Sequence, residues 1–154
     1  MDDYLIRPME PKDLERVLGI ISRHDESDEN EAREFFRDYY NNSPVDPAKC
    51  RHYVVEIEDD LVGVGGYIVP ENRDEFEIAF LFVDPYYQGQ KLGTRLLKRV
   101  CNDVRSLGAE HLLVPIDPED IPSQAIKFYE INGFSPIKPG AIDTKTKIYY
   151  RKNL

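Results

Sequence analysis

Apolar residues recur along the chain at two different spacings, which separate helices from strands. Spacings of three and four predict helices over residues 11–22, 31–42, 92–107 and 123–132. Apolar or alternating runs predict strands over residues 4–7, 52–58, 61–69, 75–83, 111–116 and 147–152, and one more that starts at Phe134. The order β-α-α-β-β-β-α-β-α-β-β predicts a single α/β domain over residues 1–154, whose mixed, mostly antiparallel sheet is flanked by helices. The strands joined by the 92–107 helix should run parallel.

One stretch joins an apolar strand to the most regular helix through a turn that contains glycines. The strand, residues 76–83, is followed by a short turn, and residues 88–94 open the helix. The first N–H groups of a helix lack partners and lie at the positive end of its dipole, so the stretch predicts an anion site. Two known phosphate-binding loops do not fit. A Walker A loop needs four residues between its glycines, whereas Gly89 and Gly93 are separated by only three, and the dinucleotide-binding pattern G-x-G-x-x-G is not present.

Three segments resemble the GNAT superfamily of N-acetyltransferases. The run Gln88-Gly89-Gln90-Lys91-Leu92-Gly93 resembles the family's acyl-CoA loop, Gln/Arg-x-x-Gly-x-Gly/Ala, with Lys91 in place of the middle glycine. Residues 125–134 resemble the later helix, A-x-x-x-Y-E-x-x-G-F, and residues 6–14 resemble the first strand and helix. The segments occur in family order and span nearly the whole chain, so the chain is identified as a member.

The resemblance implies a binding site for acetyl-CoA, the acyl-donor cosubstrate, and no metal. It implies that the sheet splays after strand 76–83, so that the main chain of Leu81 and Val83, with Phe82 between them, pairs with the pantetheine arm. It also implies that the pyrophosphate is held by backbone groups of Gln88, Gly89, Gln90, Lys91, Leu92, Gly93 and Thr94. Since lysine lacks the conformational freedom of glycine, Lys91 either adds its ammonium to a phosphate contact or points into solvent.

Two residues are candidates for catalysis. Period-two alternation places Glu77, Ala79, Leu81 and Val83 on one face of the strand and Phe76, Ile78, Phe80 and Phe82 on the other. Glu77 would then border apolar residues, which raises a carboxyl pKa toward that of a general base. It lies eleven residues before Gln88, the offset of the catalytic glutamate in histone-acetylating members. The alternatives are a solvated strand end, or a base recruited elsewhere or through water.

Tyr129 is the second candidate. The resemblance implies that this tyrosine protonates the departing thiolate, and a phenol of pKa about 10 can do so because a thiol's pKa is about 8.5. The alternative is a packing role beside Phe128 and Phe134.

The composition and net charge of the chain limit the classes of partner that it can bind. A formal net charge of -9 and a pI of about 4.8 argue against nucleic-acid binding. No apolar run approaches membrane length and no basic-plus-apolar segment precedes the first strand, so we expect no membrane contact and a cytoplasmic location.

Cys50 and Cys101 fit no metal pattern, and His24, His52 and His111 are interpreted as surface or strand-end residues. Carboxylates gather between residues 25 and 34 and either favour a cationic acceptor or form a solvated surface.

The sequence therefore predicts an N-acetyltransferase that transfers an acetyl group from acetyl-CoA to a primary amine, by direct attack in a ternary complex. The acceptor amine belongs to a small molecule or a peptide, and a homodimer is left open. Two alternatives remain: a non-catalytic CoA-binding sensor or interaction domain, and an N-acyltransferase that uses a longer acyl-CoA.

Overall fold

The computed structural model describes residues 3–41, 46–70, 74–116, 123–137 and 148–154. Its strands are β1 (Tyr4–Pro8), β2 (Cys50–Ile57), β3 (Asp60–Ile68), β4 (Phe76–Val83), β5 (His111–Ile116), β6 (Ser135–Pro136) and β7 (Ile148–Asn153). The α-helices are α1 (Leu14–Ser22), α2 (Glu26–Asn41), α3 (Leu92–Ser106) and α4 (Ser123–Ile131), with short 3-10 turns η1 (Pro11–Asp13) and η2 (Pro85–Tyr87). The predicted order of elements is confirmed.

The described strands form one sheet in the order β1-β2-β3-β4-β5-β7-β6. Neighbouring strands run antiparallel, except β4 and β5, which are parallel and are connected through α3. A parallel pair needs such a crossover because a tight turn cannot return the chain to the same end of the sheet. The predicted mixed, mostly antiparallel sheet is confirmed.

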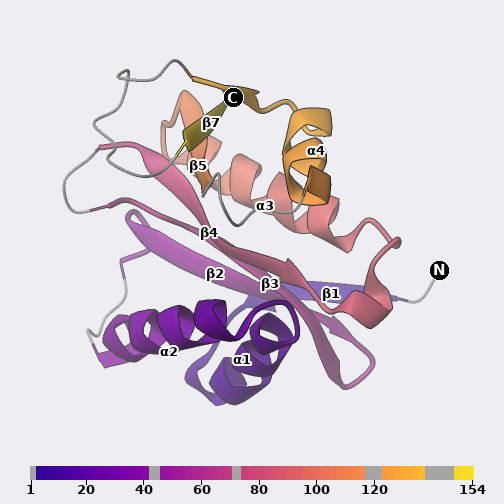
Figure 1. Cartoon of the computed structure of the whole chain (residues 1–154). Helices are drawn as coiled ribbons and strands as arrows, with labels where there is room; N and C mark the ends of the chain where they lie inside the picture. Colours follow the sequence, from indigo (N-terminus) through magenta and orange to yellow (C-terminus); the bar gives the residue numbers. More distant parts are fainter. Residues whose placement is uncertain (1–2, 42–45, 71–73, 117–122, 138–147) are drawn as a thin grey trace.

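Helices cover both faces of the sheet (Figure 1). α1 and α2 pack on one face, and α3 and α4 lie on the other. The core under α1 and α2 includes Ile21, Phe36 and Val64, whereas the core under α3 and α4 includes Val100 and Leu112. Full burial of one such side chain contributes about 1.5–3 kcal/mol, so the two cores hold the sheet rigid between them. No described helix has the length and apolarity needed to cross a membrane.

α2 starts five residues earlier than the predicted helix over residues 31–42, within the stretch where carboxylates gather. The Asp25 carboxylate accepts hydrogen bonds from the Ser27 main-chain N–H at 2.7 Å and from its hydroxyl at 2.6 Å. Glu26, Asp28 and Glu29 occupy the first turn, where the helix dipole favours negative charge. The acidic residues therefore stabilise the start of a helix rather than a loop.

An ion pair fixes the start of α1 against the edge of the sheet. The Asp13 carboxylate is 1% exposed and accepts two hydrogen bonds from the Arg7 guanidinium, each of 2.8 Å. Arg7 also donates to Glu56 of β2 at 2.9 Å. The guanidinium lowers the pKa of Asp13, so this carboxylate contributes stability that is lost as the pH falls below its ordinary value of 3.8.

Candidate functional site

The sheet opens between β4 and β5. These parallel strands pair only at Phe76 with Leu112 and Glu77 with Leu113, although β4 continues to Val83 and β5 to Ile116. Among the described residues, the main chain of β4 beyond Glu77 therefore has no strand partner on its β5 side. The splay predicted for the end of the 76–83 strand thus begins earlier, directly after Glu77.

The last residue of β4 directs its carbonyl group into this opening. The Asp84 N–H donates to the Val62 carbonyl of β3 at 2.8 Å, and the two polar groups of a trans peptide point in opposite directions. The Val83 carbonyl therefore points away from β3. It accepts a 2.7 Å hydrogen bond with His24 Nε2 and a weaker one of 3.4 Å from Gln88 Nε2. Side chains from the α1–α2 corner and from the following turn thus satisfy this one carbonyl group of the open edge.

A β-bulge interrupts β4 before this edge. Ala79 pairs with Gly66 and Phe82 with Val64, so Phe80 and Leu81 together stand opposite Gly65. Phe80 has a φ of 52°, which is rare for a bulky residue and costs of order 1–3 kcal/mol. Such strain is found mostly where a site needs one fixed backbone shape.

The bulge also reverses the faces of β4, so the predicted alternation is wrong beyond Ala79. Phe76 and Ile78 pack in the core under α3, whereas Phe80 and Phe82 pack in the core under α1 and α2. Leu81 and Val83 consequently pack on the α3 side. The extra residue shifts the period-two pattern by one position.

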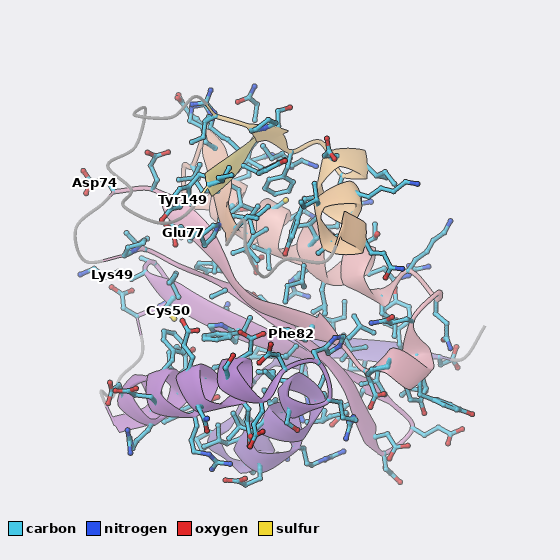
Figure 2. All side chains as sticks on the ribbon, viewed as in Figure 1. Lys49, Cys50, Asp74, Glu77, Phe82 and Tyr149 are labelled. Atoms are coloured by element: carbon cyan, nitrogen blue, oxygen red, sulfur yellow. The ribbon has the colours of Figure 1, made fainter. Side chains whose placement is uncertain are left out.

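Glu77 is the last residue of β4 that pairs with β5, and its side chain is 6% exposed. Because it alternates with Phe76 and Ile78, it faces the α2 side of the sheet. Figure 2 shows Glu77 near Tyr149 of β7, which the strand register places on the same face. The carboxylate is thus a buried group at the point where the strands part, not a solvated strand end.

The turn after β4 presents a row of unused donors. The main-chain N–H groups of residues 89–94 have no hydrogen-bond partner in the described part of the chain, and the first bond of α3 is from Arg95 N–H to the Lys91 carbonyl. The Gln88 N–H differs, because it donates to the Pro85 carbonyl at 3.4 Å. The donors without partners therefore lie at residues 89–94, and the main-chain N–H of Gln88 belongs to the preceding turn.

Two residues in this turn adopt positive φ. Gly89 has a φ of 88° and Lys91 a φ of 61°. Lys91 thus takes the left-handed conformation for which the family motif supplies glycine, and its side chain is exposed. Gly93 has a different role: a Cβ there would lie 3.5 Å from the Phe128 ring of α4 and 3.7 Å from Val83. A larger side chain at Gly93 would fill the space between β4 and α4.

Tyr129 lies on α4, beside this space. Its ring packs against Phe128 at 5.2 Å and Phe134 at 5.4 Å, in the core that also contacts Leu81. Its hydroxyl makes no hydrogen bond with another described residue. Burial raises the pKa of Tyr129, so the phenol keeps its proton at neutral pH.

Comparison with known proteins agrees with this geometry. Residues 14–134 match the family model described as Acetyltransferase (GNAT) family. The chain belongs to the GNAT acetyltransferase family. No curated protein matches the sequence at a significant level.

Solved GNAT structures share the fold. A GNAT acetyltransferase from Staphylococcus aureus Mu50 is 20% identical, with 98% of this chain and 99% of that chain covered and a TM-score of 0.77. An acetyltransferase from Streptococcus agalactiae 2603 is 17% identical, with 98% of each chain covered and a TM-score of 0.76. N-acetylglutamate synthase from Neisseria gonorrhoeae, solved with coenzyme A and N-acetyl-glutamate, is 16% identical; the match covers 100% of this chain and 36% of that one, with a TM-score of 0.74.

One histidine of this GNAT chain differs from the interpretation as surface or strand-end residues. His52 is 1% exposed and lies under α2. His24 is an exposed residue, as interpreted, and its ring also reaches the open edge of β4. His111 agrees with the interpretation, since it starts β5 and pairs with Asn153 at 3.0 Å. Strand alternation with Val54 could have indicated that His52 faces a core, whereas no sequence signal indicates the contact of His24.

The cysteines of the described residues are held as thiols. Burial raises the pKa of the Cys50 thiol to about 12 and also raises that of Cys101. A thiol with such a pKa is almost never ionised at pH 7, and the thiolate is the nucleophilic form. Within the described ranges no three His, Cys, Asp or Glu side chains gather as a metal site.

Proposed function

We propose that this GNAT chain is an N-acetyltransferase that moves an acetyl group from acetyl-CoA to a primary amine. The observation that carries the proposal is the unpaired edge of β4 beyond Glu77, which leads to unused N–H donors at residues 89–94. An extended amide chain fits the first feature, because it can pair with a strand edge. A diphosphate fits the second, because it accepts hydrogen bonds at a helix N-terminus.

In this proposal Leu81, Phe82 and Val83 hold the pantetheine arm. Residues 88–94 hold the diphosphate, with Gln88 contributing its side chain rather than its main-chain N–H. Gly93 leaves the passage open between β4 and α4. The CoA complex of the Neisseria N-acetylglutamate synthase, a fold relative, supports CoA as the ligand class.

Glu77 is proposed as the general base. An alkyl amine of pKa about 10 costs about 4 kcal/mol to deprotonate at pH 7, so a positioned carboxylate has a large barrier to lower. The burial of Glu77 beside the opening supports this role, because desolvation favours proton uptake by a carboxylate. Tyr129 is proposed as the acid that protonates the thiolate of CoA. Its hydroxyl, which makes no hydrogen bond with another described residue, supports this role, and its raised pKa ensures only that the phenol still carries its proton at pH 7.

Transfer is proposed to be direct, from acetyl-CoA to the amine. A route through an acetylated cysteine would need a thiolate near the donor, and both described thiols have raised pKa values. Acetyl-CoA supplies the activated acetyl group as a thioester. The chain's own groups hold it, remove a proton from the amine and return one to the sulfur.

A cationic amine is the proposed acceptor, small molecule or peptide. α2 covers the face of the sheet toward which Glu77 points. This helix carries more carboxylates than basic residues, which are Arg33 and Arg37. These carboxylates are Glu26, Asp28, Glu29, Glu31, Glu34 and Asp38. A surface of this sign raises the local concentration of cations and lowers that of anions.

The proposal is tested by calorimetric titration with CoA and by thiol release from acetyl-CoA across an amine panel that includes polyamines and peptide N-termini. Heat on titration together with amine-dependent thiol release supports it. Heat without thiol release from any amine supports the CoA-binding sensor instead. Release only from a longer acyl-CoA supports the alternative donor, and no heat at all contradicts the proposed site.

A matched pair of variants locates the CoA site. Gly93→Leu fills the passage beside Phe128 and Val83 and should abolish the heat of CoA binding. Gly19→Leu makes the same change in α1, where an added Cβ meets only the Arg23 side chain at 3.9 Å, and should leave binding unchanged. Equal binding by both variants would place CoA elsewhere.

A further inference from the structure

His52 is a buried titratable residue that has no role in the proposed chemistry. Its imidazole lies among the rings of Phe35, Phe36, Tyr39 and Phe80, at centroid distances from 4.9 to 6.2 Å. Neither ring nitrogen has a hydrogen-bond partner among the described residues. An unsatisfied buried polar group costs about 1–3 kcal/mol, which an apolar side chain at the same place would avoid.

The imidazole reaches from β2 across β3 to β4. His52 pairs with Gly66, and Gly66 pairs with Ala79, so the three residues form one row across the sheet. A Cβ on Gly66 would lie 2.7 Å from ring atoms of His52 and 2.1 Å from the Arg51 carbonyl oxygen. The ring therefore covers Gly66, and only glycine fits beneath it.

The nearest polar neighbour of the imidazole is on β4. Burial lowers the pKa of His52 to about 3, and the main chain of Ala79 opposes this shift, although its geometry falls short of a hydrogen bond. Ala79 directly precedes Phe80, whose φ is 52°. His52 thus contacts the strand directly before Phe80, where its backbone departs from the extended form.

The opposite face of the sheet carries a matching contact. A Cβ on Gly65 would lie 2.6 Å from Leu81 Cδ1, so the Leu81 side chain covers Gly65 on the α3 side. The two adjacent glycines of β3 therefore each accept one side chain, Leu81 on one face and His52 on the other. The bulge of β4 is held between these two contacts.

We propose that His52 is a positioning residue that fixes the bulge of β4, and through it the main chain of Leu81 and Val83 that faces the opening. The part of this inference that concerns acyl transfer rests on the proposed function. His52 touches neither reactant: it acts through Ala79 and Phe80. If His52 had only a structural role, its substitution would change stability alone. Substitution of a positioning residue also lowers kcat by more than its effect on stability explains.

The test compares three variants. His52→Leu removes the ring and its nitrogens. His52→Gln removes the ring and keeps an amide that can donate to Ala79. Val54→Ala is the control, because Val54 lies on the same strand, is fully buried in the core under α1 and α2, and belongs to the row that meets β4 at Phe82 rather than at Ala79.

The first measurement is hydrogen exchange of peptides that cover residues 78–84, which needs no ligand. His52→Leu should speed this exchange several-fold more than Val54→Ala does, with His52→Gln between them. The second measurement is thiol release with saturating acetyl-CoA and an active amine. His52→Leu should lower kcat about 10-fold with KM for acetyl-CoA within about 2-fold, because small displacements of reacting groups are costly.

Equal exchange at residues 78–84 in all three variants would overturn the proposal. Faster exchange with kcat no lower than that of Val54→Ala would overturn it as well. If His52→Leu does not fold, His52→Gln must show both effects at smaller size. A wild-type protein that binds no CoA and releases no thiol defeats the proposed function, and the exchange measurement then decides by itself whether His52 holds the bulge.

Discussion

Replacing Lys91 with glycine should stabilise the protein. Lys91 is the N-cap of α3 and has a φ of 61° and a ψ of 22°, in the left-handed region. An L side chain in this region brings its Cβ close to the following carbonyl oxygen. The side chain is exposed, so its removal forfeits no packing.

Two opposing effects set the magnitude. The left-handed conformation costs an L residue about 1–2 kcal/mol, and glycine removes this cost. Glycine also gives the unfolded chain more freedom, which costs about 0.5–1 kcal/mol. The net expectation for Lys91→Gly is a gain of about 0.5–1 kcal/mol, which for a chain of this size raises Tm by about 1–4 °C.

The assay is urea denaturation and scanning calorimetry of the wild type, Lys91→Gly and Lys91→Ala. Alanine removes the charge but keeps the Cβ, so it should bring no gain; Lys91→Gly that is no more stable than Lys91→Ala refutes the reasoning. Titration of the same proteins with CoA at two salt concentrations decides the role of the ammonium. A salt-sensitive loss of affinity in Lys91→Ala indicates a phosphate contact, and unchanged affinity indicates solvent.

Three further substitutions test the site and the fold. Glu77→Gln should lower kcat at pH 7 by about 100-fold and leave CoA binding intact, and an unchanged pH–rate profile would remove Glu77 from the mechanism. Tyr129→Phe should lower kcat about 10-fold or more at unchanged CoA affinity, and full turnover would reject the acid role. Asp13→Asn should destabilise the protein at pH 7 by about 2 kcal/mol, since it removes the charged acceptor of two Arg7 hydrogen bonds and leaves Glu56 as the remaining short ion-pair partner of Arg7. Because the pKa of Asp13 is lowered, the difference from the wild type should shrink as the pH falls below 3.8; a constant difference in urea denaturation would contradict the ion-pair account.

The order of elements and the N–H groups without partners before α3 could be predicted from the sequence because their signals are local. Gly89 and Gly93 mark a turn before a regular apolar stripe, and that pattern alone places unpaired N–H groups at one point. The start of α2 could not be predicted from periodicity. Carboxylates typical of a solvated loop are equally typical of a first helical turn, and the hydrogen bonds of Asp25 to Ser27 decide between them.

The reversal of faces in β4 could not be predicted from the sequence, for a different reason. Residues 76–83 are apolar on both faces except at Glu77, so a shift by one position leaves the pattern of polar and apolar residues almost unchanged. The bulge depends on contacts with another strand, Leu81 over Gly65 and His52 over Gly66. The side chains that require glycine at these two positions lie 14 or more residues away in the sequence, so no local pattern indicates the contacts.

The net charge does not show that the fold separates basic residues from acidic ones. The chain carries a formal charge of -9, yet α3 and its N-cap carry mostly positive residues, namely Lys91, Arg95, Lys98, Arg99 and Arg105, against a single Asp103. α2, whose sequence carries most of the nearby carboxylates, lies on the opposite face of the sheet (Figure 1). An anionic donor and a cationic acceptor would therefore each meet a face of opposite charge, and the two would approach the opening beside Glu77 from different sides. The proposed ternary complex gains from this arrangement because neither charged reactant has to cross the field that attracts the other.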